Sequence, residues 1–305
     1  MSTAIVRVRA IAAALVATLS FATPVSADTM IVGDKARTYT VTRPPSSSRA
    51  PLVLVLHGAG GNGHRIAEYT GWSSLAKANG FAATFPDAIG GNWEFASAVV
   101  GAPGNPDLRF LNKLIATLVA DGTADPRRVY ITGLSRGGAM TYAMVCGKAQ
   151  LFAAAAPVIT GAAADLVRTC RPFKPVPMLV MNGTADKLIP YDGGRGTGPT
   201  ADVTLMPVPD FMAFWRTTNG CSSQTTGERV LPDLDPADKS RVTIVASACP
   251  ESRDVVHYRI DGGGHQQPRR PAPRGGGAIA ADLGPQNHDI DGAAEIWSFF
   301  KRFSL

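Results

Sequence analysis

Short apolar runs recur along the chain and are separated by stretches rich in glycine and proline. Runs of this length without polar alternation are typical of strands that are buried on both faces of a parallel sheet. Residues 37–42 alternate polar and apolar side chains instead, as a half-buried edge strand does. The continuous runs predict further strands over residues 51–56, 81–85, 129–134, 153–158, 176–181 and 255–260, the last of these being the final strand.

Helical segments lie between these strands. Asn105 and Pro106 occupy the N-cap and first-turn positions before a stripe of apolar residues with the 3.6-residue period. A second helix covers residues 211–215 and ends at the Asn-Gly pair 219–220, and a C-terminal helix begins near residues 289–291. Because strands and helices alternate, we expect an α/β fold, with a mainly parallel central sheet and helices on both faces.

The N-terminus has the pattern of a secretory signal peptide. Arg7 and Arg9 precede an apolar run over residues 10–21, and residues 25–27 place small side chains at the positions of a cleavage site. The apolar run is too short to span a bilayer. We therefore expect residues 1–27 to be removed on export to the extracellular space or the periplasm.

The composition fits one globular domain over residues 28–305, since 45% of the residues are hydrophobic and 18% are charged. The net charge of +6 is a mild bias, and Arg269, Arg270 and Arg274 form a local cluster of basic residues that we interpret as a solvated loop. There is no basic stripe with interleaved aromatic residues, so we expect no nucleic-acid partner. We also expect no membrane partner and a monomer in solution.

The chain has four cysteines, an even number that indicates disulfides in an oxidising compartment. They allow three pairings, and no C-x-x-C pair favours zinc. We favour Cys146 with Cys170 and Cys221 with Cys249, because each of these bonds closes a short loop outside the central strands.

The strongest local motif is Gly133-Leu134-Ser135-Arg136-Gly137, which has the form G-x-S-x-G. It directly follows a predicted strand and directly precedes a helical stripe. This context is required by a nucleophile elbow, a sharp turn that exposes the serine hydroxyl while the glycines let the neighbouring chain approach. We therefore predict that Ser135 is a nucleophile rather than part of a structural glycine turn.

A nucleophilic serine needs a base, and the base needs an acid to orient it. In this architecture the acid and then the histidine follow the serine, each after a later strand. Asp186 and His265 fill these two positions. Asp192 is the rival acid, but its sequence, Tyr-Asp-Gly-Gly, predicts a turn in which aspartate caps its own backbone. The remaining histidines do not have the position of the base, and no pair of histidines has the spacing of metal ligands.

The oxyanion hole completes the predicted site. Residues 56–61 follow a buried strand and match the loop that supplies one backbone N–H, while Arg136, which follows the nucleophile, supplies the other. Either Ala59 or Gly60 is the donor in the loop. His57 more simply braces this loop than takes part in proton transfer.

Trp93 is the candidate substrate contact, because it lies in a glycine-rich loop after a strand. An aromatic ring in that position can stack on a planar acyl group or on a sugar. Packing of the same ring against the core, as an anchor for the loop, is an equally good interpretation.

Taken together, these motifs resemble those of secreted esterases of the polyhydroxybutyrate depolymerase type, a group that includes feruloyl and acetyl-xylan esterases with the α/β-hydrolase fold. The resemblance implies the triad Ser135, Asp186 and His265, with no metal and no organic cofactor. The matching segments cover nearly the whole chain after the signal peptide, in order: residues 56–62, 85–93, 129–138, 176–194, 219–221, 258–265 and 290–300.

The chain departs from the group where substrate is bound. Relatives often have Trp-Pro-Gly shortly after the histidine, whereas His265 is followed here by Gln-Gln-Pro-Arg. We expect a secreted serine esterase that acts on feruloyl or acetyl esters of plant polysaccharide. The alternative is a depolymerase of polyhydroxybutyrate or hydroxyalkanoate oligomers, and an acyltransferase ranks third.

Overall fold

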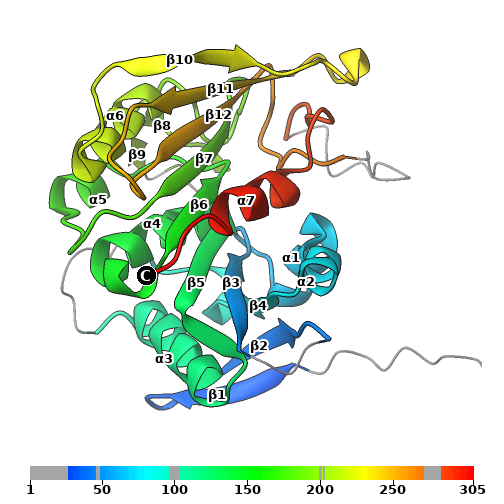
Figure 1. Cartoon of the computed structure of the whole chain (residues 1–305), viewed down its shortest axis with the longest axis vertical. Coiled ribbons are helices and arrows are strands. Elements are labelled where there is room, and N and C mark those ends of the chain that lie inside the picture. Colours follow the sequence, from blue (N-terminus) through cyan, green and yellow to red (C-terminus); the bar gives the residue numbers. More distant parts are fainter. Residues whose placement is uncertain (1–26, 46–48, 96–103, 199–200, 202, 271–282) are drawn as a thin grey trace, which may run out of the picture.

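A ten-stranded sheet forms the centre of the molecule in the computed structural model, with the order β1-β2-β4-β3-β5-β6-β7-β12-β11-β10 (Figure 1). The structure describes residues 27–45, 49–95, 104–198, 201, 203–270 and 283–305. The predicted signal peptide, apart from Ala27, lies outside the described residues. The strands of this sheet are β1 (Asp28–Val32), β2 (Lys35–Thr42), β3 (Ala50–Leu56), β4 (Ala82–Pro86), β5 (Ala124–Leu134), β6 (Ala154–Val158), β7 (Met178–Gly183), β10 (Thr225–Val230), β11 (Arg241–Ser247) and β12 (Val255–Asp261).

The middle of the sheet is parallel and both its edges are antiparallel. Strands β4, β3, β5, β6, β7 and β12 run parallel to one another. Strands β1 and β2 at one edge, and β11 and β10 at the other, pair antiparallel. Every predicted strand is present and the mainly parallel α/β prediction is confirmed. However, β12 is followed in the sheet by two strands, β11 and β10, that the sequence pattern did not predict.

Helices cover both faces of the sheet, as the alternating pattern predicted (Figure 1). The α3 N-cap is Asn105, whose side chain accepts from the amides of Asp107 and Leu108, and Asp291 caps α7 in the same way. Helix α6 ends at Gly220 in the left-handed conformation. The helices are α1 (Gly63–Thr70), α2 (Trp72–Asn79), α3 (Pro106–Ala120), α4 (Arg136–Lys148), α5 (Ala164–Thr169), α6 (Val208–Asn219) and α7 (Gly292–Phe300).

The alternation of side chains along β3 explains why its run is apolar throughout. Leu54 and Leu56 belong to the core beneath α3, α4 and α6, whereas Val53 and Val55 belong to the core beneath α1, α2 and α7. All four side chains are at most 1% exposed. A strand between two cores has no polar face, and its sequence therefore shows no polar alternation.

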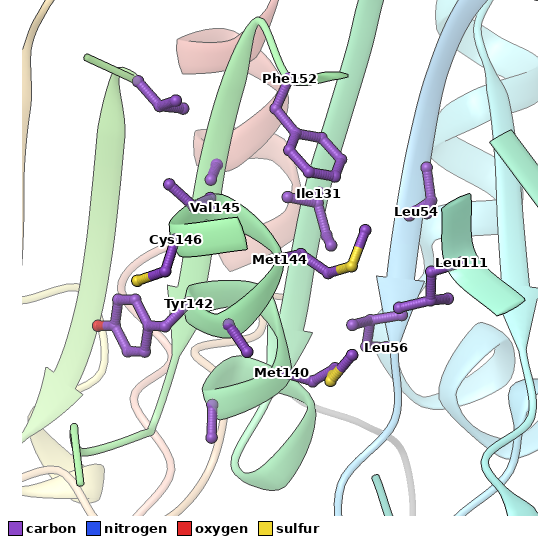
Figure 2. Packing of buried hydrophobic residues seen from close by; sticks show 14 of the residues in the cluster. Leu54, Leu56, Leu111, Ile131, Met140, Tyr142, Met144, Val145, Cys146 and Phe152 are labelled. Carbon is purple, nitrogen blue, oxygen red and sulfur yellow. The ribbon is translucent and has the colours of Figure 1, made fainter. Parts of the chain in front are cut away.

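Helix α4, which carries the serine motif at its start, is buried on almost all sides. Figure 2 shows Met140 and Met144 pointing toward Leu56 and Leu111, while Tyr142 and Cys146 point to the opposite side. These four α4 side chains are at most 6% exposed. A helix packed on all sides is unable to shift without opening the core, so the core fixes the position of the residue at its N-terminus.

The two disulfides have the pairing expected from the sequence. Cys146, in α4, is bonded to Cys170, which directly follows α5. Cys221, just beyond α6, is bonded to Cys249, which follows β11. Both bonds therefore tie a helix to a neighbouring segment outside the parallel strands. Within the described part of the chain, no helix has both the length and the apolarity needed to cross a membrane.

Candidate active site

Ser135 lies in a strained turn between β5 and α4. Its backbone φ of 54° and ψ of −117° are values that a non-glycine residue rarely adopts. A side chain at Gly133 would collide with the Gly137 backbone, and one at Gly137 would collide with the carbonyls of Leu56 and His57. The glycines of the motif therefore allow close approach of the chain, as predicted, and the turn is the nucleophile elbow that the sequence pattern indicates.

Asp186 and His265 are hydrogen-bonded to each other. His265 Nδ1 lies 2.7 Å from Asp186 Oδ2, and the two side chains are 7% and 2% exposed. The other carboxylate oxygen, Oδ1, accepts from the amides of Leu188 and Ile189, both at 2.8 Å. Because Nδ1 donates its proton to the carboxylate, Nε2 of the neutral ring carries a free lone pair. The rival acid, Asp192, is exposed.

The two residues come from loops at the same edge of the sheet as Ser135. Asp186 follows β7, His265 follows β12 and Ser135 follows β5. In the sheet these strands lie in the order β5-β6-β7-β12, all parallel. In the described part of the chain, no hydrogen bond joins the Ser135 hydroxyl to His265. Such bonds are often long in ligand-free enzymes and shorten when substrate binds.

Glycines bring the histidine loop close to the loop after β7. The Ala185 amide donates to the Gly263 carbonyl at 2.9 Å, and a side chain at Gly183 would collide with the backbone of Gly263 and Gly264. On the other side, the His265 amide donates to Leu283 O at 2.6 Å. The loop that carries the base is thus packed between two backbone segments.

The loop after β3 lies beside the nucleophile. A Cβ atom added at Gly58 would lie 3.6 Å from Ser135 Cβ. The Gly60 amide donates to Gly91 O at 2.9 Å, whereas the Ala59 amide has no recorded acceptor in the described chain. Arg136 is the first residue of α4, where the amide has no partner within the helix. Of the two amides that the sequence left open, that of Gly60 is therefore engaged, and that of Ala59 has no acceptor among the described residues.

His57 braces this loop, as expected. Its Nδ1 donates to Gly58 O at 2.7 Å and its Nε2 accepts from the Ala88 amide at 3.1 Å. Both bonds are made by the neutral ring, because a protonated Nε2 has no lone pair to accept with. Burial lowers the pKa of His57, and the hydrogen bond to the Gly58 carbonyl opposes that shift.

The structure corrects the substrate-contact interpretation of Trp93. Its side chain is 1% exposed, and its Nε1 donates to His57 O at 2.9 Å. The two rings lie 5.1 Å apart. A ring buried in this way cannot stack on a substrate, so Trp93 is the anchor of the loop, which was the other interpretation. The sequence could not decide between them, since a tryptophan in a glycine-rich loop suits either.

A small pocket opens beside the serine. Polar groups at its wall come from Ser135, Arg136 and Thr160. Its apolar wall includes Phe95, Ile189, Val203 and Leu205. Two of these come from the segment 193–209, which was predicted to lie near the site. The antiparallel pair β8 (Gly194–Arg195) and β9 (Thr204–Leu205) forms part of that segment. The other long loop, residues 262–285, carries His265. Its residues 271–282, which include Arg274, lie outside the described residues.

Sequence reasoning missed the apolar wall of the pocket. Ile189 is only three residues beyond Asp186 and is 4% exposed. Leu205 is 5% exposed and lies in β9. The available signal was a few apolar residues in a loop, which is too weak to separate a substrate pocket from ordinary packing.

One cluster of side chains has the geometry of a metal site. The ligand atoms of Asp235, Asp238 and His288 lie within 4.8 Å of one another. However, His288 Nδ1 is hydrogen-bonded to Asp235 at 3.1 Å, and Asp238 accepts from Ser240 Oγ at 2.6 Å and from the His288 amide at 2.7 Å. Hydrogen bonds within the cluster account for its geometry, and we do not assign it a metal.

Comparisons with known proteins agree with this geometry. The family model of the Prolyl oligopeptidase family matches residues 69–169, which include Ser135. "Putative esterase NocK" of Nocardia uniformis subsp. tsuyamanensis is 27% identical over 78% of this chain and 73% of its own length. "Feruloyl esterase B" of Piromyces equi is 25% identical over 84% of this chain, which spans only 42% of that relative.

Solved structures give the same fold. An acetyl xylan esterase from Aspergillus awamori superimposes with a TM-score of 0.57, over 75% of this chain and 89% of its own, at 16% sequence identity. That identity supports the fold alone, whereas the sequence relatives support the activity. The esterase resemblance and the fold predicted from the motifs are both confirmed. The chain therefore has the α/β-hydrolase fold and is a carboxylic-ester hydrolase.

Proposed function

We propose that the protein hydrolyses esters through an acyl-enzyme on Ser135. Ser135 attacks the ester carbonyl while His265 Nε2 takes the hydroxyl proton and passes it to the leaving alcohol. Water then attacks the acyl-enzyme while His265 takes a proton from that water, and His265 passes this proton to the Ser135 oxygen as the acid product leaves. Asp186 holds the imidazole in the required tautomer. The observation that carries the proposal is the buried 2.7 Å hydrogen bond between His265 Nδ1 and Asp186 Oδ2.

The oxyanion of the tetrahedral intermediate is bound by two backbone amides, those of Arg136 and Ala59. Both amides lack an acceptor in the described chain, and both lie in segments that the core holds firmly. Donors that are fixed before the reaction stabilise the developing charge without a cost of reorganisation. Gly60 supports the same loop through its bond to Gly91 and is not a donor to the oxyanion.

For substrate we propose feruloyl or acetyl esters of plant polysaccharide. Sequence relatives named as a feruloyl esterase and as a bifunctional acetylxylan esterase/xylanase support this class. Within the class, the small pocket lined by Ile189 and Leu205 favours a short acyl group such as acetyl. The two disulfides support action outside the cytoplasm, in the extracellular space or the periplasm, and we propose that the protein acts there as a monomer.

The triad is tested by two substitutions with a matched control. Ser135→Ala removes the nucleophile, and turnover of p-nitrophenyl acetate should fall to the background rate. Asp186→Asn should lower kcat by about three to four orders of magnitude, because the amide no longer holds the histidine tautomer. Asp192→Asn changes the exposed aspartate that was the alternative candidate for the acid of the triad, and it should leave the rate unchanged. Near-normal turnover by Ser135→Ala, with circular dichroism showing a folded protein, would refute the proposal.

The acyl group is tested by comparing methyl ferulate, acetylated xylan and hydroxybutyrate oligomers as substrates of the same preparation. We expect the highest kcat/KM on acetylated xylan. A clear preference for hydroxybutyrate oligomers would favour the depolymerase alternative. Product analysis with an added alcohol or sugar acceptor separates hydrolysis from acyl transfer, since a transferase forms the new ester and a hydrolase releases the free acid.

A further inference from the structure

The guanidinium of Arg136 lines the pocket beside the nucleophile. Its backbone amide is assigned to the oxyanion hole, but the side chain has no part in the mechanism described above. No carboxylate pairs with it among the residues that the structure describes. The remaining wall is apolar apart from the hydroxyls of Ser135 and Thr160, and the Thr160 hydroxyl donates to the Gly161 carbonyl at 3.2 Å.

The contacts that this guanidinium makes with the described residues leave most of its N–H donors unused. Nη1 donates to the Trp93 carbonyl at 3.5 Å, at the limit of a hydrogen bond, and Cζ lies 5.1 Å from the centre of the Phe95 ring. The Nε atom is buried and has no partner. An arginine has five N–H donors in a planar fork, so this site offers several donors to a ligand.

Arg37 shows how this fold treats an arginine with a structural role. Its Cζ also lies over a phenylalanine, Phe110, at 4.0 Å. However, its Nη2 donates to Asp107 Oδ1 at 2.6 Å and to the Asp87 carbonyl at 3.0 Å. The buried charge is therefore neutralised within the protein. Arg136 also lies near a phenylalanine ring, that of Phe95, but the described residues supply no counter-ion for it.

An uncompensated cation in a partly buried site is costly to the folded protein. Burial alone is enough to lower the pKa of Arg136, which shows that desolvation of this group is not offset by a nearby acid. A cation kept at such a cost beside a nucleophile is explained if the counter-ion arrives with the substrate.

We propose that Arg136 is a specificity-determining residue that binds a carboxylate of the substrate, a few atoms away from the scissile ester bond. The inference rests on the proposed function, since it concerns the same pocket. One guanidinium balances the single charge of a carboxylate and matches its two oxygens with parallel hydrogen bonds. A phosphate monoester carries about −1.5 to −2 charges and is less well matched by a lone arginine. Between two esters that are otherwise alike, the protein should thus prefer the one that carries a carboxylate over its neutral counterpart.

The test uses pairs of esters that differ only in charge. In the first pair, the linear dimer of 3-hydroxybutyrate carries the carboxylate on the alcohol portion, and its N-methylamide is the neutral counterpart. In the second pair, monoethyl adipate carries the carboxylate on the acyl portion, and the ethyl ester of N-methyladipamic acid is neutral. Cleavage of the shared ester bond is followed by chromatography, and kcat/KM is measured for each member.

The wild-type protein should prefer the acid to the amide by about tenfold or more in at least one pair, as charge-assisted hydrogen bonds are stronger than neutral ones. That pair then identifies which side of the ester carries the charge. Arg136→Met should bring the ratio close to one, whereas Arg136→Lys should keep part of it because a point charge remains. Each ratio is internal to one variant, so a change in overall rate does not affect it.

Arg195→Met is the matched control, because Arg195 is an exposed arginine of β8, next to the segment that lines the pocket. It should leave the acid-to-amide ratio unchanged. A wild-type ratio at or below one in both pairs, or a ratio that Arg136→Met does not alter, would overturn the inference. Neither result touches the proposed function, which is tested separately by the turnover of p-nitrophenyl acetate by the wild-type protein and by Ser135→Ala.

Discussion

The oxyanion loop and the histidine loop lie at the same edge of the sheet but are held by different means. The oxyanion loop, residues 57–61, is fixed mainly by buried side chains, since His57 bonds to Ala88 and Trp93 bonds to the His57 carbonyl. One backbone bond, from the Gly60 amide to Gly91 O, adds to them. The histidine loop, residues 262–268, is held through backbone bonds such as that from the Gly264 amide to Pro285 O at 2.7 Å.

This difference indicates which substitutions each loop tolerates. A loop held by side chains can lose one contact and keep its path, because the others remain. A loop that depends on close backbone approach at glycines has no space for an added methyl group. We therefore expect the position of His265 to be more sensitive to small substitutions than the oxyanion amides are.

The largest effect should come from Gly183→Ala. The added methyl group would collide with the backbone of Gly263 and Gly264 and would push the base away from Asp186. Misplacement of a catalytic group by about 1 Å costs on the order of a hundredfold in rate, so kcat/KM on p-nitrophenyl acetate should fall by at least about that factor. Gly104→Ala is the control, since a Cβ there meets no atom within 4 Å. Full activity of Gly183→Ala would show that the histidine loop adjusts freely.

A smaller effect is expected in the oxyanion loop from Trp93→Phe. This change keeps a buried ring but removes the donor to the His57 carbonyl, which costs about 1 kcal/mol of stability and about tenfold in kcat. Trp215→Phe is the matched control: that tryptophan is 0% exposed, and its Nε1 has no partner in the described structure. Urea unfolding and steady-state kinetics on both variants give the comparison. Equal effects of the two substitutions would contradict the role of the Trp93 bond.

The smallest effect is a loss of stability at acidic pH, and it comes from a histidine in β12, the strand that leads into the histidine loop. His257, in β12, is fully buried, and desolvation lowers its pKa from 6.5 to about 3. The unfolded chain therefore binds one more proton than the folded chain between these values, and stability should fall as the pH drops from about 6.5 toward 3. His257 contributes at most about 1.4 kcal/mol per pH unit to this slope.

Unfolding free energies measured across that window should show a flatter slope in His257→Phe than in the wild-type protein. The matched control is His64→Gln, since the His64 side chain is 66% exposed. It should leave the slope unchanged. His57 adds a contribution of the same sign, because burial lowers its pKa as well. An unchanged slope in His257→Phe would show that this histidine does not remain neutral in the folded protein.

Burial on both faces made the centre of the sheet easy to predict, and its absence hid one edge. Strands such as β3 lie between two cores and therefore appear as continuous apolar runs. Every residue of β10 is exposed, and the strand is held by backbone pairing with β11. A strand that buries no side chain leaves no hydrophobic pattern in the sequence, and β10 was missed for that reason.

The sequence places the candidate site wherever chain order and strand ends constrain it. Ser135 has its motif, and Asp186 and His265 follow the strands after which the acid and the base occur in this architecture. The choice between Ala59 and Gly60 depended on a bond to Gly91, a contact between loops that no local pattern records. The role of Trp93 depended on burial, which is a property of the folded chain alone.

The central claim is that Ser135 is the nucleophile of an acyl-transfer site. It is tested most directly by labelling the protein with a fluorophosphonate probe and mapping the adduct by peptide mass spectrometry. We expect one adduct, on Ser135, with loss of esterase activity in proportion to labelling, and no adduct in the Asp186→Asn variant over the same short reaction time. An adduct on another residue, or full activity with Ser135 labelled, would contradict the account.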